Sequence, residues 1–141
     1  GANSLLNYGY AIMRATVARA IVAAGLHPTI GVGHANRGNP LALADDLIEP
    51  FRPLVDGLVS HMALAGETMA LTPPTKRRFA RLIAFDLRID GQTSPVAQAA
   101  IRLAQSLARA FETGRPNLNL FEPPTPLEWS RIAADRVDDT E

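Results

Sequence analysis

The sequence predicts an all-α fold, an irregular helical bundle with at least four helices and with room for one short β-hairpin near residues 85–93. Two observations favour this class. Apolar residues recur at intervals of three and four through most of the chain, which is the spacing of one face of a helix. Clusters of glycine and proline separate these periodic segments near residues 25–39, 65–73 and 85–94.

The first helix is expected over residues 4–24, and Gly25 is placed to end it. Its apolar face is broad, so we expect the helix to be largely buried. Asn7, Tyr8 and Tyr10 near its start could line a functional site. Packing in the core is the more common use of such side chains, and we expect it for at least two of the three.

A glycine-rich loop over residues 26–38 precedes the second helix, which is expected to begin at Pro40. Pro50 and Pro53 then interrupt the helical pattern, and each removes a backbone donor. We therefore expect either one long bent helix that reaches about Leu64 or two helices joined near Pro50.

Three more elements are expected in the second half of the chain. A short helix over residues 76–84 follows a Thr-Pro-Pro-Thr start signal. Residues 85–89 alternate apolar and charged before an Asp-Gly turn signal, which predicts a small hairpin or an extended connector. Ser94-Pro95 is expected to cap the last clear helix, over about residues 95–112.

The inner face of that last helix is expected to consist of its apolar residues at helical spacing: Val96, Ala99, Ala100, Leu103, Leu107, Ala110 and Phe111. Residues 115–141 form a proline-rich and acidic tail. Leu127 to Val137 could form a short helix there, and the rest of the tail could be loose or docked on a partner.

The stretch from Gly31 to Pro53 differs from the ordinary amphipathic pattern of the chain. His34 lies between glycines in the expected loop, and the following helix carries Asp45, Asp46 and Glu49 within five residues. Acids spaced by three or four residues share a helix face, and carboxylates with a histidine form a half-shell for a hard divalent metal. The alternative is that the acids only complement the dipole at the start of a helix.

The amino-acid composition limits the classes of protein to which the chain can belong. The 141 residues are enough for one core, the hydrophobic fraction is 47%, and cysteine is absent, which excludes thiolate metal sites and suits a reducing cytoplasm. No apolar run approaches the roughly 18 residues of a membrane span, and no signal peptide is recognisable at the start. We therefore expect a cytoplasmic protein with no membrane partner.

The net charge does not indicate nucleic-acid binding, because the 14 basic and 14 acidic residues give a formal net charge of zero. The distribution is uneven, however. Lys76, Arg77, Arg78 and Arg81 cluster within six residues and could grip DNA, although a solvated helix face would look the same.

Several ordered motifs resemble the CRISPR adaptation integrase, the universal Cas protein that inserts new spacers. They are NSLLNYGYAIMRA (3–15), AGLHPTIGVGH (24–34), LADDLIEPFRPLVD (43–56), LTPPTKRRFARLI (71–83) and DGQTSPVAQAAIRLAQSLARAF (90–111). The sequence LADDLIEPFRP most resembles the branch of the family that accompanies single-effector, type II systems. The resemblance implies that residues 1–114 are the helical catalytic domain and residues 115–141 a tail.

The family also has a β-rich N-terminal domain and a metal-binding glutamate upstream of the asparagine-tyrosine motif. The chain begins too late to contain either, so we expect an incomplete site and a fragment that is nearly inactive alone. The resemblance implies that His34 and Glu49 are metal ligands and that Asp46, one turn before Glu49, is the further acid of the site. It implies Mg²⁺ or Mn²⁺ as cofactor and metal-dependent phosphodiester transesterification as the reaction.

The implied partners are DNA, as spacer precursor and CRISPR repeat, a second copy of the full-length protein, and the small ferredoxin-like CRISPR adaptation protein. Arg37 and Arg52 are near the proposed ligands and could bind phosphate, although Arg52 could equally pair with Glu49 or Asp56. Two alternatives stay open at this point. One is a non-catalytic helical module that binds DNA or protein, and the other is an unrelated helical metal hydrolase.

Overall fold

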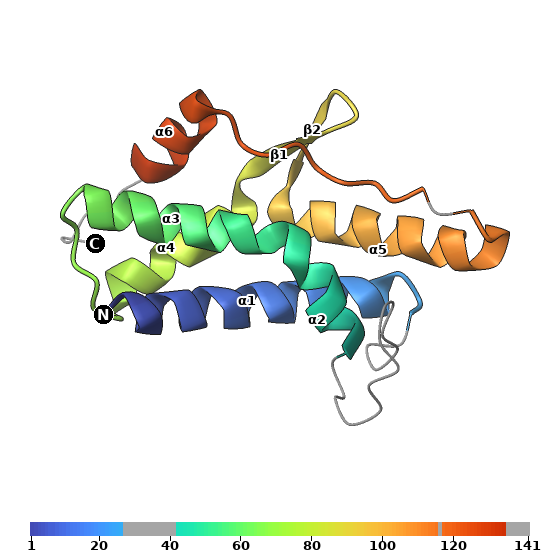
Figure 1. Ribbon diagram of the computed structural model, residues 1–141, viewed down its shortest axis with the longest axis horizontal. Helices are drawn as coiled ribbons and strands as arrows, with labels where there is room; N and C mark the ends of the chain where they lie inside the picture. The colour runs from blue at the N-terminus through green and yellow to red at the C-terminus, as the bar shows by residue number, and fades with distance from the viewer. Residues whose placement is uncertain (27–41, 116, 135–141) are drawn as a thin grey trace.

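The computed structural model describes residues 1–26, 42–115 and 117–134 (Figure 1). The elements in chain order are α1 (Ala2–Ala23), α2 (Ala42–Ile48), a 3₁₀ turn η1 (Glu49–Phe51), α3 (Arg52–Leu64), α4 (Pro73–Ala84), β1 (Asp86–Ile89), β2 (Gln92–Pro95), α5 (Val96–Thr113) and α6 (Pro126–Ala134). The predicted all-α class with one short hairpin is confirmed. None of the described helices combines the length and the apolar character needed to cross a membrane.

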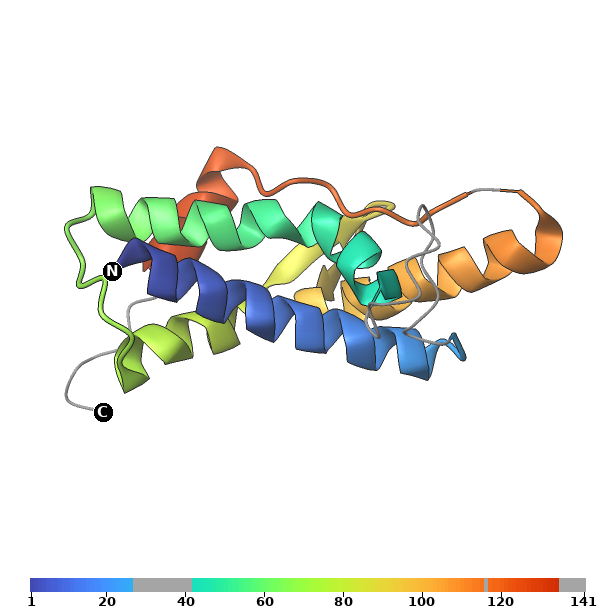
Figure 2. The ribbon, with the colours of Figure 1, turned by 60° about the horizontal axis from the view of Figure 1, so that its bottom comes forward.

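Helix α1 contacts four other helices, which are α2, α3, α4 and α5. Figures 1 and 2 show α3 running back along α1. Gly9 makes this close packing possible, because a Cβ atom there would lie 2.5 Å from Val55 Cγ1 and 2.6 Å from Phe79 Cε1. The largest fully buried side chains around α1 come from all these helices and from the hairpin: Leu5, Met13, Ile21, Leu43, Phe51, Leu54, Leu58, Met62, Phe79, Leu87, Ile89 and Leu103.

The second helical segment is two helices joined near Pro50, one of the two forms expected. α2 ends at Ile48, the 3₁₀ turn η1 contains Pro50, and α3 begins at Arg52 with Pro53 in its first turn. The two prolines cannot donate backbone hydrogen bonds, so the chain tightens into a 3₁₀ turn instead of continuing as one α-helix. The expected start of this segment at Pro40 lies outside the described residues.

The predicted hairpin is present. β1 pairs antiparallel with β2, and Asp90 and Gly91 between them have φ of 51° and 77°. Both central residues of this turn thus lie in the left-handed region, which Asp-Gly sequences favour at tight hairpin turns. The preceding helix α4 begins three residues earlier than expected because Thr72 and Thr75 form a reciprocal capping box in front of it.

Two expectations about α5 were wrong. Ser94 does not cap the helix, because Ser94 and Pro95 belong to strand β2 and pair with Leu87 and Asp86. Phe111 does not belong to the buried face, since 54% of it is exposed near the end of the helix. The last turns of α5 extend beyond α1 and α3, so the periodicity of the sequence continues where little of the bundle remains to cover it (Figure 1).

The described part of the tail returns along the bundle instead of extending away from it (Figure 2). Glu122 forms an isolated bridge with Arg88 of β1, and α6 then packs on α3. The Trp129 ring stacks on His61 with centroids 5.1 Å apart, and a Cβ atom on Gly57 would lie 2.3 Å from the indole. A helix was expected over Leu127–Val137, and the structure begins it one residue earlier.

Candidate functional site

The acidic residues of the candidate site lie at the junction of α2 and η1. Leu43, Leu47, Ile48 and Phe51 are buried on the inner side of this segment. Asp45 and Asp46 are half-buried and Glu49 is exposed. The apolar positions thus anchor the segment in the core and leave its acids at the surface, where they can meet a ligand.

Asp45 is used to hold the fold together. Its Oδ1 lies 2.8 Å from Nε of Arg14, and its Oδ2 accepts a hydrogen bond of 3.1 Å from Nη2 of the same guanidinium. This ion pair with its single hydrogen bond ties α2 to α1, and it places one of the three clustered acids in a structural role.

Glu49 is held at the surface by an arginine of the next helix. Its Oε1 accepts a hydrogen bond of 2.9 Å from Nε of Arg52, and the two side chains are 65% and 40% exposed. Of the two partners considered for Arg52, the structure selects Glu49. The Arg52 guanidinium also lies over the ring of Tyr10 on α1, with Cζ 4.9 Å from the ring centroid.

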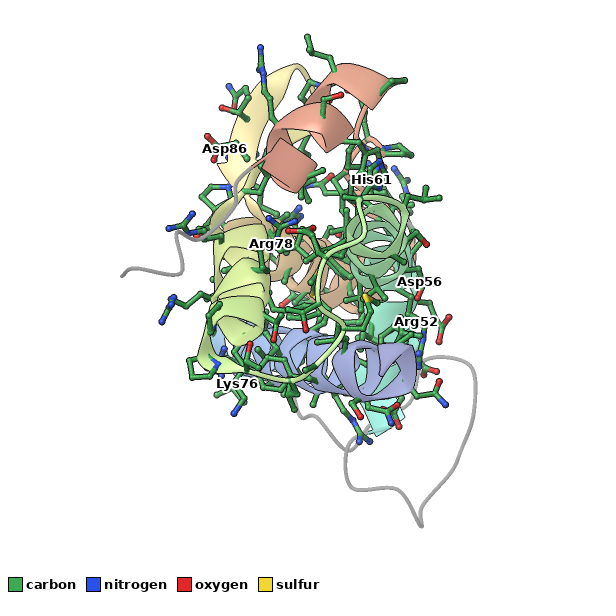
Figure 3. The ribbon with its side chains drawn as sticks, turned by 90° about the vertical axis from the view of Figure 1, so that its left-hand side faces the viewer. Arg52, Asp56, His61, Lys76, Arg78 and Asp86 are labelled. Carbon is green, nitrogen blue, oxygen red and sulfur yellow. The ribbon has the colours of Figure 1, made fainter. Side chains whose placement is uncertain are left out.

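Asp56 pairs with Tyr10, whose hydroxyl group donates a hydrogen bond to Oδ1 of Asp56. This hydrogen bond raises the pKa of the Tyr10 phenol, with smaller upward contributions from burial and from the Asp56 charge and a downward one from Arg52. Figure 3 shows Arg52 and Asp56 projecting from the same side of α3. Tyr10, Arg52 and Asp56 therefore form one cluster beside Glu49.

The described residues offer part of a metal site. Asp46 and Glu49 supply carboxylate oxygens three positions apart, the ligand class that Mg²⁺ and Mn²⁺ take. Within residues 1–26, 42–115 and 117–134, no group of three His, Cys, Asp or Glu side chains is placed to hold an ion. His34, the third predicted ligand, and Arg37 lie outside this part of the chain. The carboxylates fit half of a hard-metal shell.

The predicted basic cluster on α4 is divided by the fold. Figure 3 shows α4, with Lys76 and Arg78, across the bundle from Arg52 and Asp56. Arg78 is 5% exposed; its Nη2 lies 3.2 Å from Oε2 of Glu67 and donates to the Ala133 carbonyl. Arg78 was expected to bind DNA, but its burial and its contacts with Glu67 and Ala133 give it a structural role instead.

The two other arginines of that cluster remain partly accessible. Arg77 is half-buried, and its Nε atom has no hydrogen-bond partner within the described ranges. Arg81 lines a cavity of about 830 Å³ together with Arg88 of β1 and Arg131 of α6. Both residues belong to α4, which lies across the bundle from Arg52, so the structure does not gather the predicted DNA contacts at one place (Figure 3).

Sequence reasoning missed two polar contacts of α1, one with Asp45 on α2 and one with Asp56 on α3. Tyr10 and Arg14 are four residues apart, so they share a face of α1, and each meets an aspartate of the following helices. A polar pair at this spacing on an otherwise apolar helix is a signal that could have found them. Tyr10 was considered for the site floor, whereas Arg14 was not considered at all.

The sequence of this chain is similar to those of known proteins. The model of the family "CRISPR associated protein Cas1" matches residues 1–70. The CRISPR-associated endonuclease Cas1 of Neisseria meningitidis is 38% identical over 118 residues, which are 83% of this chain and 38% of that protein. The CRISPR-associated endonuclease Cas1 2 of Pyrobaculum aerophilum is 34% identical over 113 residues, which are 79% and 38% of the two chains.

A solved structure has the same fold. A casposase bound to an integration product superimposes with a TM-score of 0.73 at 24% identity, over 99% of this chain and 41% of the casposase chain. The chain thus spans about two fifths of the length of these relatives. At 24% identity the superposition shows that the two chains share a fold, and it does so over 99% of this chain.

Proposed function

Because the chain belongs to the Cas1 family of CRISPR-associated proteins, we propose that it forms the helical catalytic domain of a metal-dependent DNA endonuclease and integrase. The reaction is phosphodiester transesterification during spacer acquisition, in which a 3′-hydroxyl group of incoming DNA attacks a phosphodiester of the CRISPR repeat. The bond from phosphorus to the former 3′-oxygen of the attacked strand breaks as the new bond forms, and that oxygen leaves as a 3′-hydroxyl group. The observation that carries the proposal is Glu49, an exposed carboxylate three positions after Asp46 that pairs with Arg52, on a segment anchored by the buried side chains of Ile48 and Phe51.

The proposed metal ligands are His34, Asp46 and Glu49, with Mg²⁺ or Mn²⁺ as the ion. Such an ion polarises a phosphoryl oxygen and orients the attacking and leaving oxygens. Histidine favours Mn²⁺ over Mg²⁺, so the ligand set suits Mn²⁺ best. We assign residues 1–114 to the catalytic domain and residues 115–141 to a tail, of which α6 docks on α3.

The other residues of the site would handle the DNA backbone. Arg52 projects its guanidinium beside Glu49 and can bind a phosphate there, and Arg37 is proposed for a neighbouring phosphate. Arg77 and Arg81 lie on α4, on another surface, where they would contact a more distant part of a long or bent DNA. Many such contacts together make affinity depend steeply on salt.

The proposed partners follow from the family and from the neighbour. The named relatives are CRISPR-associated endonucleases, and the casposase is bound to an integration product. For this protein we propose spacer-precursor and repeat DNA as substrates. A homodimer of the full-length protein and the ferredoxin-like adaptation protein complete the assembly.

One observation favours a second candidate, a non-catalytic helical module that binds DNA or protein. Two acids of the cluster are engaged by arginines, Asp45 by Arg14 and Glu49 by Arg52. Under this alternative the acids only stabilise the bundle, and no metal is bound.

Replacing Glu49 separates the two candidates. Glu49→Gln in the full-length protein should abolish Mn²⁺-dependent strand transfer on branched and repeat DNA, and it should weaken Mn²⁺ binding measured by calorimetry. Glu112→Gln is the matched control, because it removes one exposed glutamate from α5, away from the site. Retained strand transfer and unchanged Mn²⁺ binding in Glu49→Gln would favour the non-catalytic module.

A further inference from the structure

Four side chains from three elements stand in series beside the candidate site. Asp56 accepts a hydrogen bond from the Tyr10 hydroxyl group, the Tyr10 ring lies under the Arg52 guanidinium, and Arg52 contacts Glu49. We call Asp56, Tyr10 and Arg52 the Tyr10 support. It connects α1 to the acidic residue on which the proposed chemistry depends.

The core does not require this support. Asp56 is exposed, and Tyr10 and Arg52 are only half-buried, so none of the three satisfies a fully buried polar group. A hydrogen bond to the hydroxyl group of a tyrosine fixes the direction of the axis from Cβ to the phenol oxygen, and therefore the position of the ring relative to the helix that carries it. A cation over such a ring has a preferred place even without a salt bridge.

The ion pair with Glu49 would not keep Arg52 in place during a reaction. A carboxylate that coordinates a metal ion shares or gives up its contact with an arginine, and a released arginine side chain regains several rotamers. The attraction to the Tyr10 ring does not depend on Glu49, so it persists in both situations. The ion pair uses Nε of Arg52, and the terminal nitrogens of the same planar group are the atoms that would contact a phosphate.

We propose that Tyr10 is a positioning residue: anchored by Asp56, its ring holds the Arg52 guanidinium beside Glu49, where Arg52 binds a backbone phosphate of the substrate DNA. The inference rests on the proposed function for the identity of the substrate. It adds a residue on α1 that touches neither metal nor DNA and acts through Arg52. It also gives a reason for the hydrogen bond between a surface tyrosine and a surface aspartate.

DNA binding without metal tests the inference apart from catalysis. Fluorescence anisotropy of a labelled branched DNA is measured with the full-length protein in EDTA. Arg52→Ala should lower the slope of log affinity against log salt by about one, the value for one lost phosphate contact. Tyr10→Leu should weaken binding about two- to fivefold, which corresponds to a surface cation–π contact. Tyr10→Phe keeps the ring and should weaken binding less than Tyr10→Leu.

A double-mutant cycle distinguishes positioning from a general structural role. If Tyr10 acts through Arg52, Tyr10→Leu has no further effect on DNA affinity in the Arg52→Ala background. Tyr8→Leu is the matched control, because Tyr8 packs against Phe79 and Lys76 and any effect should be equal in both backgrounds. An equal loss from Tyr10→Leu in both backgrounds, or no loss in either, would overturn the inference. Should Tyr10→Leu not fold, Tyr10→Met replaces it in the same cycle.

Failure of this inference and failure of the proposed function give different results. If Glu49→Gln abolishes strand transfer and the Tyr10 cycle is additive, the positioning role alone is wrong. If Glu49→Gln leaves strand transfer unchanged while Tyr10 and Arg52 are coupled in DNA binding, the catalytic proposal is wrong and the coupled pair serves a DNA-binding module.

Discussion

Arg78 and Glu67 form an enclosed ion pair, with Nη2 of Arg78 3.2 Å from Oε2 of Glu67 and side chains 4% and 18% exposed. The same nitrogen donates to the carbonyl oxygen of Ala133. The pair therefore joins the segment after α3, the middle of α4 and the end of α6. An arginine within a basic run of the sequence thus serves to connect three parts of the bundle.

Replacing Arg78 should damage the fold. Arg78→Met leaves Glu67 without its buried partner, so the free energy of unfolding should fall by about 3 kcal/mol in urea denaturation. Lys76→Met is the control: this exposed residue on the same helix should change stability by no more than about 0.5 kcal/mol. Unchanged stability with weakened DNA binding by Arg78→Met would restore the surface role that the sequence predicted.

Acid should release the docked tail through Glu128. The Thr125 backbone N–H donates to Glu128 Oε1 over 3.1 Å, the Glu128 N–H donates to Thr125 Oγ1 over 3.2 Å, and Arg88 lies 3.2 Å from the same carboxylate. The backbone hydrogen bond from Thr125 is the main cause that lowers the pKa of Glu128 below 4.5, and burial opposes it. A lowered folded-state pKa means that the stabilisation is complete above pH 4.5 and is lost as the pH falls through the folded-state pKa.

Trp129, the single tryptophan of the chain, reports this transition because it packs on α3 next to Glu128. Its fluorescence emission should shift to longer wavelength below pH 4.5. Glu128→Gln keeps an oxygen that can accept from Thr125 but cannot titrate, so the acid step should disappear. An identical acid step in Glu128→Gln would mean that another carboxyl group controls the docking.

Most of the helices could be predicted from the sequence, because periodicity and proline or glycine signals act over short distances. The bend at Pro50 and the Asp90-Gly91 turn are examples, since both follow from local backbone chemistry. Ser94-Pro95 misled the prediction, because a Ser-Pro pair also ends a strand and only pairing with β1 decides between the two.

The candidate site could be predicted only in part. Asp45, Asp46 and Glu49 are recognisable as a group, but the sequence does not say which of them is paired. The pairing of Asp45 depends on Arg14, which is 31 residues away in the chain and reaches the acid only through the packing of α1 on α2, whereas Glu49 pairs with its near neighbour Arg52. The burial of Arg78 depends in the same way on α6, which is 55 residues from it by the Ala133 contact.

Asp45 and Glu49 should respond to neutralisation in opposite ways. Asp45→Asn weakens the contact with Arg14 that ties α2 to α1, so the free energy of unfolding should fall by about 0.5–1 kcal/mol at low salt, as for a partly exposed ion pair. The loss should shrink in 1 M salt, where such a pair is screened. Mn²⁺-dependent strand transfer should remain within about twofold of wild type, because Asp45 is proposed neither as a ligand nor as a DNA contact.

Glu49→Gln should leave the free energy of unfolding within about 0.5 kcal/mol of wild type, because an exposed carboxylate contributes little to the fold. It should remove strand transfer, because Glu49 is a proposed metal ligand. Thermal unfolding and strand transfer measured on both variants decide the matter, and loss of activity in Asp45→Asn with unchanged stability would show that the metal ligands have been assigned to the wrong aspartate.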